Sequence, residues 1–368
     1  MFGTKNDRGT PLRLSDLAKA LNLSVTTVSR ALAGYPDVAP ATRARVEKAA
    51  RRSGYKPNPV ARSLRTGRTG AVGVVLPTDP GRFDDPFFLQ FLAAMGRKFA
   101  AAEIDLLVTA ARPGEEEIKV YRRLIDHRRV DGIVVARTRR HDPRIEFLQS
   151  RGFPFVAHGR VETRKPYAYV DVDGAAAFEA ATRRLAAFGH RNIALVNAPD
   201  SYMFAHFRAE GWRRGLERLG LPPGRMRAAE PTEENGHRLT RELLGAPDRP
   251  TAILCATDRL AVGALHAIAA AKLRPGRDVS VIGYDDLPMA SYTDPPLTTI
   301  RQPLAEAGDR TVAILIELMA GADPAAYAEL LEARLVARAS DGPPASSVVA
   351  PTQIPKTGGT DNEAAESR

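Results

Sequence analysis

The chain has 368 residues, 44% of them apolar, which is enough for two or three domains with sizeable cores. Its apolar stretches are too short to span a membrane, and its N-terminus lacks the apolar segment of a secretory signal. Cys255 is the single cysteine, so an intrachain disulfide is excluded, and no Cys/His group has zinc spacing. We therefore expect a cytoplasmic protein with no membrane association, metal or cofactor.

The excess positive charge is confined to one end of the chain. Residues 1–70 contain 14 basic and 4 acidic side chains, whereas residues 71–368 contain 39 of each sign. A compact basic module beside a neutral body is typical of nucleic-acid binding, because phosphates attract clustered Lys and Arg. The helical patterning of the basic segment argues against the alternative of a disordered basic tail.

The first 70 residues divide into a tail, a headpiece and a linker. Residues 1–10 are expected to be a disordered tail, residues 11–57 a headpiece, and residues 58–69 a linker punctuated by prolines and Gly67. Helices are predicted in the headpiece at about residues 15–21, 25–32 and 41–53. Ser15 or Asp16 is placed to cap the first of them.

From residue 70 onward, short apolar strands alternate with longer amphipathic stretches. Strands are predicted at about residues 71–77, 104–111, 130–136, 153–159, 192–198, 251–257 and 278–284. Helices are predicted at about residues 86–102, 116–128, 145–152, 176–189, 260–271 and 306–319. This alternation implies parallel, doubly wound sheets, with room for two such units. Residues 338–368 are rich in Pro, Ser, Gly and Thr and are expected to be disordered.

The first two predicted helices are joined by a tight turn, as in a helix-turn-helix, whose second helix enters a major groove of DNA. The exposed positions of the second helix carry Thr26, Thr27, Ser29 and Arg30. Arg pairs with guanine O6 and N7, and Ser and Thr suit phosphates or base edges. Val25 offers only an apolar surface, suited to a thymine methyl. A purely structural three-helix bundle is the alternative, and the charge asymmetry argues against it.

The segment from Leu14 to Leu64 resembles the headpiece of the lactose-repressor (LacI) family, in LSDLAKALNLSVTTVSRAL and VAPATRARVEKAARRSGYKPNPVARSL. Further blocks resemble the family in family order: FDDPFF, RRVDGIVV, VDVDG, FGHRNIALV, RAEGW, ATDRLAVGAL and VSVIGYDDLPMASYTDPPLTTIRQP. Each block alone is weakly specific, but the ordered set is highly specific. Within the family, RRVDGIVVARTRRHDPRIEFL and FPFVAHGR resemble regulators of α-glucoside use.

The resemblance implies an all-α three-helix helix-turn-helix headpiece plus an α/β body like that of periplasmic binding proteins, with two doubly wound parallel-sheet subdomains. The body, residues 70–337, is expected to bind a ligand and to form the dimer. Its first lobe is placed at about residues 70–168 and 301–320. Its second lobe is placed at about residues 169–300 and 321–337, with crossovers near Tyr169, Ile300 and Tyr327.

The resemblance also implies DNA-binding residues. Recognition positions fall on Val25, Thr26 and Arg30. Phosphate-contact positions fall on Ser24, Thr27, Ser29, Thr42 and Tyr55. In the family the linker forms a hinge helix on the operator, where a leucine wedges into the minor groove. That leucine matches Leu64, with Asn58 and Ala61 nearby; a packing leucine is the alternative.

The ligand is expected in the cleft between the lobes. The first lobe is expected to supply Asp85, Phe87, Phe88, Leu89 and Arg160, and the second Arg208, Thr257 and Asp285. Structural roles remain open for several of these, because Arg208 could be solvated, Asp285 could cap a turn, and at least one of the two phenylalanines is expected in the core. Arg137 either lies on a solvated edge or extends the cleft.

Together these features predict a homodimeric regulator, a repressor of carbohydrate-utilisation genes, that binds a near-palindromic double-stranded operator and responds to a sugar such as an α-glucoside. A regulator that uses a purine or sugar phosphate as corepressor is the alternative. An enzyme is not expected, because the chain has no GxxxxGK[ST], no GxGxxG after a strand and no GxSxG. A transport binding protein does not explain the basic headpiece, and a nucleoid-type protein does not explain the neutral body.

Overall fold

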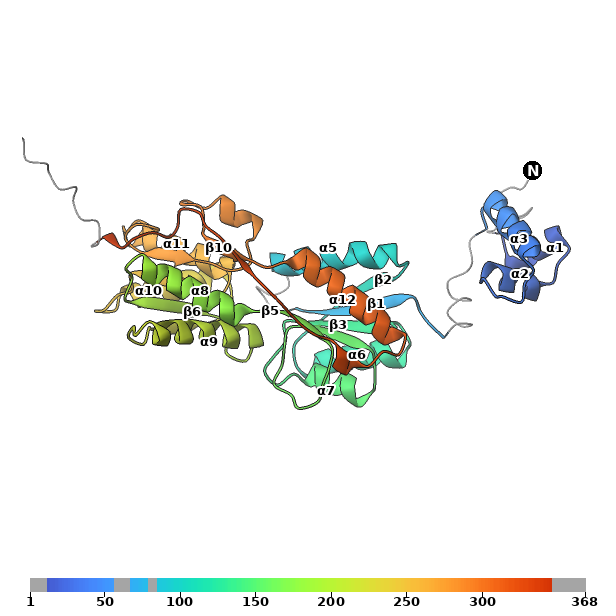
Figure 1. Ribbon diagram of the computed structural model, residues 1–368, viewed down its shortest axis with the longest axis horizontal. Coiled ribbons are helices and arrows are strands. Elements are labelled where there is room, and N and C mark those ends of the chain that lie inside the picture. The colour runs from blue at the N-terminus through green and yellow to red at the C-terminus, as the bar shows by residue number, and fades with distance from the viewer. Residues whose placement is uncertain (1–11, 56–66, 79–84, 346–368) are drawn as a thin grey trace, which may run out of the picture. The chain divides into compact units, whose positions relative to one another are not determined.

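The computed structural model describes residues 12–55, 67–78 and 85–345. The chain divides into two compact units, one with the helical headpiece and one with the α/β body (Figure 1). The predicted tail 1–10 lies outside the described residues, as do the hinge positions Asn58, Ala61 and Leu64. Within the described ranges, no helix combines the length and the apolar character needed to cross a membrane.

Three helices form the headpiece: α1 (Leu14–Leu21), α2 (Val25–Leu32) and α3 (Pro40–Ser53). Ser24 begins α2, because its Oγ accepts a hydrogen bond from the Thr27 backbone N–H at 3.0 Å. Helix α1 starts one residue earlier than expected, and Asp16 lies inside it, where its carboxylate accepts from Arg13 N at 2.9 Å. Apolar side chains from all three helices meet in a small core centred on Leu17, Val28 and Val46.

The first lobe of the body is a six-stranded parallel sheet in the order β11-β5-β4-β3-β1-β2. Its strands are β1 (Ala71–Pro77), β2 (Asp105–Ala111), β3 (Gly132–Ala136), β4 (Phe155–His158), β5 (Tyr169–Val172) and β11 (Ala328–Leu331). Helices α5 (Pro86–Ala101) and α12 (Leu304–Met319) pack together on one face. Helices α6 (Glu115–Asp126) and α7 (Pro143–Ser150) cover the other face (Figure 1).

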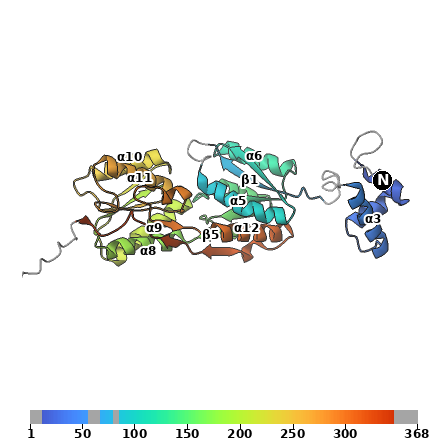
Figure 2. The same ribbon diagram turned by 90° about the horizontal axis from the view of Figure 1, so that it is seen from above.

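The second lobe is a four-stranded parallel sheet in the order β7-β6-β8-β9. Its strands are β6 (Ile193–Asn197), β7 (Met226–Ala228), β8 (Ala252–Cys255) and β9 (Ser280–Ile282). Its helices are α8 (Gly174–Ala187), α9 (Met203–Arg218), α10 (Glu233–Leu244) and α11 (Asp258–Ala270). Helices α8 and α9 pack as one pair and α10 and α11 as another, on opposite faces of the sheet (Figure 2). Cys255 and Trp212 are buried in the cores of this lobe.

The chain crosses between the lobes slightly later than predicted. Residues 169–172 and 328–331, expected in the second lobe, form β5 and β11 of the first-lobe sheet. They belong there because Val170 is buried in the first-lobe core and β11 pairs with β5 along its whole length. Strands β10 (Thr299–Arg301) and β12 (Arg334–Val336) pair antiparallel, and β10 is bridged to the β9 side of the second lobe. Two short 3₁₀ helices, η1 (Pro288–Ser291) and η2 (Pro324–Ala326), complete the body.

The expectation of disorder from residue 338 onward is wrong for residues 338–345. Ser340 is fully buried, donating its Oγ to Val281 O at 2.7 Å and accepting from Thr298 N at 2.8 Å. Asp341 accepts from the Thr298 hydroxyl at 2.6 Å and from Arg184 Nε at 2.6 Å. These long-range hydrogen bonds make the segment part of the second lobe despite its polar composition.

Truncation at two points tests this assignment. Removing residues 338–368 should lower the free energy of unfolding by about 3–5 kcal/mol, because several buried hydrogen bonds are lost at roughly 1 kcal/mol or more each. Removing only residues 346–368 should leave the melting temperature close to that of the full chain. Equal melting temperatures for the two truncated proteins, measured by calorimetry, would contradict a structural role for residues 338–345.

Candidate functional site

The turns that follow the parallel strands of both lobes converge on one pocket. In each sheet the first strand, β1 or β6, has the next two strands of the chain on opposite sides. The turns that follow neighbouring strands therefore run in opposite directions, which leaves a crevice at the carboxyl ends of the strands. Asp85 follows β1, Arg137 follows β3 and Asp285 follows β9, and all three line the pocket. About 670 Å³ of space, including solvent at the open mouth, lies between the lining residues.

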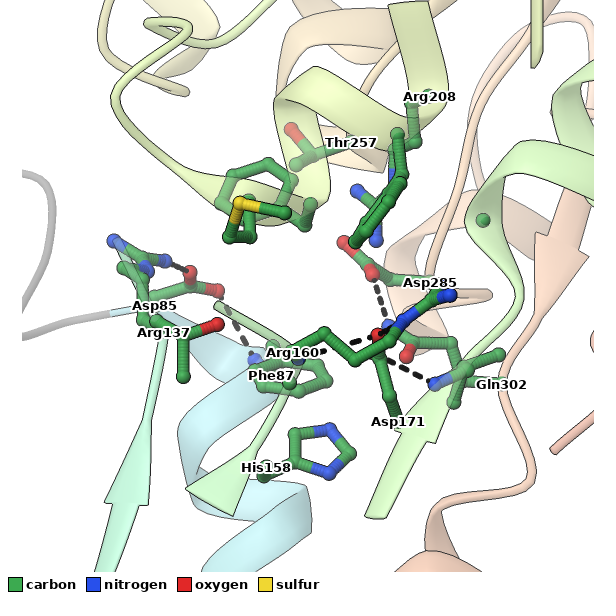
Figure 3. Close-up of a pocket in the computed structure, with 17 residues that line it drawn as sticks. Asp85, Phe87, Arg137, His158, Arg160, Asp171, Arg208, Thr257, Asp285 and Gln302 are labelled. Atoms are coloured by element: carbon green, nitrogen blue, oxygen red, sulfur yellow. Dashed lines mark hydrogen bonds and ion pairs between the residues drawn. The ribbon is translucent and has the colours of Figure 1, made fainter. Parts of the chain in front are cut away.

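One wall of the pocket carries a buried ion pair between Asp85 and Arg137 (Figure 3). Asp85 also caps α5, because its Oδ1 accepts from Phe87 N at 3.1 Å. The Arg137 guanidinium lies 5.0 Å from the centre of the Phe88 ring. Its Nη1 is buried and has no hydrogen-bond partner among the described residues. Of the two interpretations of Arg137, the structure favours the one that extends the cleft.

A second ion pair lies toward the opposite side, where Arg160 Nε donates to Asp171 Oδ2 at 2.7 Å (Figure 3). The Arg160 guanidinium stacks 3.9 Å from the centre of the Phe207 ring, and its Nη2 is buried without a partner in the described part of the chain. Arg160 therefore links the first lobe, through Asp171, to an aromatic ring of the second lobe. It keeps an N–H group available for an acceptor on a ligand.

The second lobe contributes Arg208, Thr257 and Asp285. Arg208 is 6% exposed, donates to the Ala256 carbonyl, and lies 3.6 Å from the centre of the Tyr284 ring. Asp285 accepts from Gln302 Nε2 at 2.7 Å. Burial raises the pKa of Asp285 well above its usual range, an effect that the nearby Arg208 opposes.

Thr257 caps α11 through Leu260 N at 3.3 Å. Behind the pocket wall, burial also raises the pKa of the Asp258 carboxyl to about 6. Asp258 accepts from Leu287 N at 2.8 Å, which fixes the loop after Asp285.

Apolar and aromatic surface completes the pocket. Phe87 lines it, and so do Met203, Phe204 and Phe207 from α9. His158 packs 4.3 Å from the centre of the Phe91 ring, and burial lowers its pKa below the usual 6.5, so the ring is neutral at pH 7. Flat apolar faces beside paired charges suit a ligand with both ring faces and many oxygens.

Six of the eight predicted ligand residues line the pocket: Asp85, Phe87, Arg160, Arg208, Thr257 and Asp285. Phe88 does not, because it is 3% exposed and belongs to the first-lobe core. Leu89 is 63% exposed and lies outside the pocket lining. Several lining residues were not predicted from the sequence, namely His158, Asp171, Met203, Phe204, Phe207 and Gln302. For two of them, His158 and Asp171, the signal in the sequence was a polar residue at the end of a predicted or observed strand.

The second helix of the headpiece presents the predicted recognition residues together. Val25 is 48% exposed, and Thr26 and Arg30 are also exposed. Ser24 and Thr27 bond to each other through their hydroxyls at 2.8 Å, at the start of α2. The other predicted phosphate contacts on the described headpiece, Ser29, Thr42 and Tyr55, are half-buried.

Arg30 is held across the end of α2 rather than extended into solvent. Its Nη2 lies 2.5 Å from Asp37 Oδ2, and its guanidinium lies 5.2 Å from the centre of the Tyr35 ring. Both partners come from the segment between α2 and α3. An exposed pair of this kind contributes about 0–1 kcal/mol, so a stronger acceptor can replace Asp37.

Comparison with known proteins supports both parts of this description. Residues 13–58 match the family described as bacterial regulatory proteins, lacI family, and residues 182–340 match a periplasmic binding protein-like domain. The chain is 39% identical over 355 residues to the HTH-type transcriptional regulator AglR of Rhizobium meliloti, across 95% of this chain and 99% of that protein. The chain belongs to the LacI family of transcriptional regulators. The predicted family, and the predicted fold of a helix-turn-helix headpiece with a periplasmic-binding-protein-like body, are confirmed.

Solved structures of LacI-family members share this fold. The Lac repressor dimer bound to operator and the anti-inducer ONPF aligns with a TM-score of 0.79 and 29% identity, across 90% of this chain and 100% of that chain. The complex of the transcriptional regulator CelR with cellobiose aligns with a TM-score of 0.69 and 28% identity, across 89% and 99%. Relatives of this LacI-family regulator therefore bind operator DNA as a dimer and bind a sugar. As a transcriptional regulator of this family, the chain is not an enzyme.

Replacing Arg30 tests the headpiece surface of this LacI-family regulator. An operator is first selected from random duplexes with the wild-type protein. Arg30→Met should then reduce the ratio of operator to random-duplex affinity by about 5- to 150-fold, because a bidentate arginine–guanine contact is worth roughly 1–3 kcal/mol of discrimination.

The matched control is Arg51→Met, which removes an exposed, ion-paired arginine from α3 and should leave the ratio unchanged. Mobility shifts at one salt concentration measure both ratios. An Arg30→Met protein with the wild-type ratio would remove Arg30 from the recognition surface.

Proposed function

We propose that this protein is a homodimeric repressor of carbohydrate-utilisation genes, released from a near-palindromic operator by a neutral sugar bound between its two lobes. Two identical headpieces related by twofold symmetry require two related half-sites, hence the palindrome. The similarity to regulators that bind operator DNA and cellobiose supports both halves of the proposal. The motifs ARTRRHDPRIEFL and FPFVAHGR favour α-glucosides as the sugar class.

The observation that carries the sugar assignment is the balance of charge in the pocket. Three arginines and three aspartates line it. Two of the arginines are already neutralised, Arg137 by Asp85 and Arg160 by Asp171. The buried N–H groups that remain on these two side chains need acceptors, but the two ion pairs carry no net positive charge to attract a phosphate. A polyhydroxylated neutral ring meets this requirement, whereas a nucleotide or a sugar phosphate brings negative charge that these two ion pairs do not balance.

The proposal is tested with purified full-length protein and glucose, maltose, sucrose, trehalose, cellobiose, glucose 6-phosphate and hypoxanthine. A neutral sugar should raise the melting temperature and should weaken binding to the selected operator. A response to glucose 6-phosphate or hypoxanthine alone, or tighter operator binding with the active compound, would support the corepressor alternative instead. Absence of any sugar response would overturn the assignment of the pocket.

Asp285 is expected to bind sugar hydroxyl groups. Asp285→Asn should weaken binding of the active sugar roughly twofold to tenfold, because a hydrogen bond to the Asp285 carboxyl group contributes about 0.5–1.5 kcal/mol. Operator affinity without sugar should be unchanged. The control is Asp286→Asn, since Asp286 pairs with Arg301 and Arg338 and lies outside the pocket lining. Wild-type sugar affinity in Asp285→Asn, measured by titration calorimetry, would contradict the proposed role.

Leu64 remains a prediction, because it lies outside the described residues. Leu64→Ala should leave folding and sugar binding intact, but should reduce operator affinity and DNA bending, since an apolar wedge between base pairs bends the duplex. Mobility shifts with circularly permuted operator fragments measure the bend. An unchanged bend angle would assign Leu64 to packing rather than to the minor groove.

A further inference from the structure

A cluster of buried charges lies behind the pocket in the first lobe and outside the pocket lining. Glu117, Asp142 and Arg144 are each 3% exposed or less. Arg144 donates to Asp142 at 2.6 and 2.8 Å and to Glu117 Oε1 at 3.3 Å. Arg139 reaches the other oxygen of Glu117 at 2.7 Å. Buried ion pairs seldom stabilise a fold more than apolar packing would. The role considered for this cluster is therefore to hold neighbouring groups in position.

The cluster holds the main chain at the end of β3. Arg144 donates from Nη1 to Ala136 O at 3.1 Å and from Nη2 to Arg137 O at 3.0 Å. Asp142 accepts from Arg139 N at 3.0 Å. Three main-chain groups of this turn are therefore fixed by hydrogen bonds. They are the Ala136 and Arg137 carbonyl groups, which lie on either side of the Arg137 Cα, and the Arg139 N–H group.

The residue fixed in this way has an unusual backbone. Arg137 has φ of +50°, in the left-handed region that a side chain other than glycine seldom adopts. Such backbone conformations persist where several surrounding contacts hold them in place, and they are common at ligand-binding sites. This conformation accompanies the placement of the guanidinium in the pocket wall, paired with Asp85 and with Nη1 buried and unpartnered among the described residues.

We infer that Arg137 binds an oxygen of the effector, and that Glu117 and Arg144 are positioning residues that hold Arg137 in its binding conformation without touching the effector. The inference rests on the proposed sugar-binding function and deepens it. It makes the turn after β3 a determinant of which sugar is bound. Arg137 interacts with the ligand, whereas the buried cluster acts only through Arg137.

The experiment is a double-mutant cycle on the full-length protein. Maltose, sucrose, trehalose and cellobiose are titrated separately by calorimetry, and the disaccharide that binds the wild type most tightly is used. Arg137→Met should weaken its binding about tenfold or more, and Glu117→Gln should weaken it by a similar factor. The double variant should bind the disaccharide no more than about twofold more weakly than Arg137→Met does, because both changes abolish the same contact between Arg137 and the sugar. Operator affinity without sugar should not change in any variant.

Two controls separate positioning from stability. Glu116→Gln changes an exposed glutamate on the same helix and should bind the disaccharide as the wild type does. If Glu117→Gln does not fold, Arg144→Lys replaces it, since lysine keeps a charge beside Asp142 but lacks the fork that reaches both carbonyl oxygens.

The outcomes distinguish this inference from the proposed function. If none of the four disaccharides binds the wild type, this inference fails, and the sugar assignment fails with it when glucose does not bind either. If one binds the wild type and binds Arg137→Met within twofold, only this inference fails. Additive losses in the double variant would show that the cluster acts independently of Arg137 and would overturn its positioning role.

Discussion

Parallel strand pairing is the constraint on which the pocket depends. It brings every turn that follows a strand to one edge of its sheet, so residues as distant in sequence as Asp85 and Asp285 line one space. The same convergence crowds ionisable side chains into a poorly solvated volume, where an unpaired charge is costly. Pairing within the wall, as between Arg160 and Asp171, removes most of this cost and leaves only individual N–H groups unsatisfied. The fold thus produces a pocket whose two ion pairs are neutral yet keep buried hydrogen-bond donors.

Much of the fold could be predicted because its local signals agree with its packing. The run at 71–77 is apolar, short and bounded by Gly70 and Pro77, and it forms β1 over those residues. Helix α2 has a serine cap and exposed polar residues on one face, and its predicted bounds are the observed ones. In such segments the local preference and the tertiary environment favour the same structure.

The remaining features depend on contacts that local patterns do not encode. Residues 338–345 have the composition of a disordered tail, but Ser340 is ordered by its bonds to Val281 and Thr298 in distant parts of the chain. Phe88 was expected beside the pocket because the family resemblance places the start of this helix at the cleft, but it packs with Phe91 in the first-lobe core. His158 and Asp171 could be assigned to the site only once the sheet order was known, because a polar residue at a strand end is common.

Opposite walls of the pocket come from different lobes, and this has a consequence for control. Arg137 belongs to the first lobe and Arg208 and Asp285 to the second. Next to Arg137, the Thr138 carbonyl accepts from Met203 N at 3.0 Å, and Arg140 pairs with Asp200 at 2.7 Å, so the lobes are joined at the rim of the pocket. A ligand that contacts both walls adds to these bridges and favours the arrangement in which they form.

A ligand shifts a conformational equilibrium only by the difference between its affinities for the two states. A sugar bound to one lobe alone has nearly the same contacts in every arrangement of the lobes and therefore shifts nothing. A sugar that contacts both Arg137 and Asp285 keeps both contacts only in some arrangements of the lobes, so its affinity differs between them. Couplings of this kind reach about 1–3 kcal/mol, or roughly 5- to 150-fold in DNA affinity. The residues that select the sugar are thus the same residues through which the sugar can act.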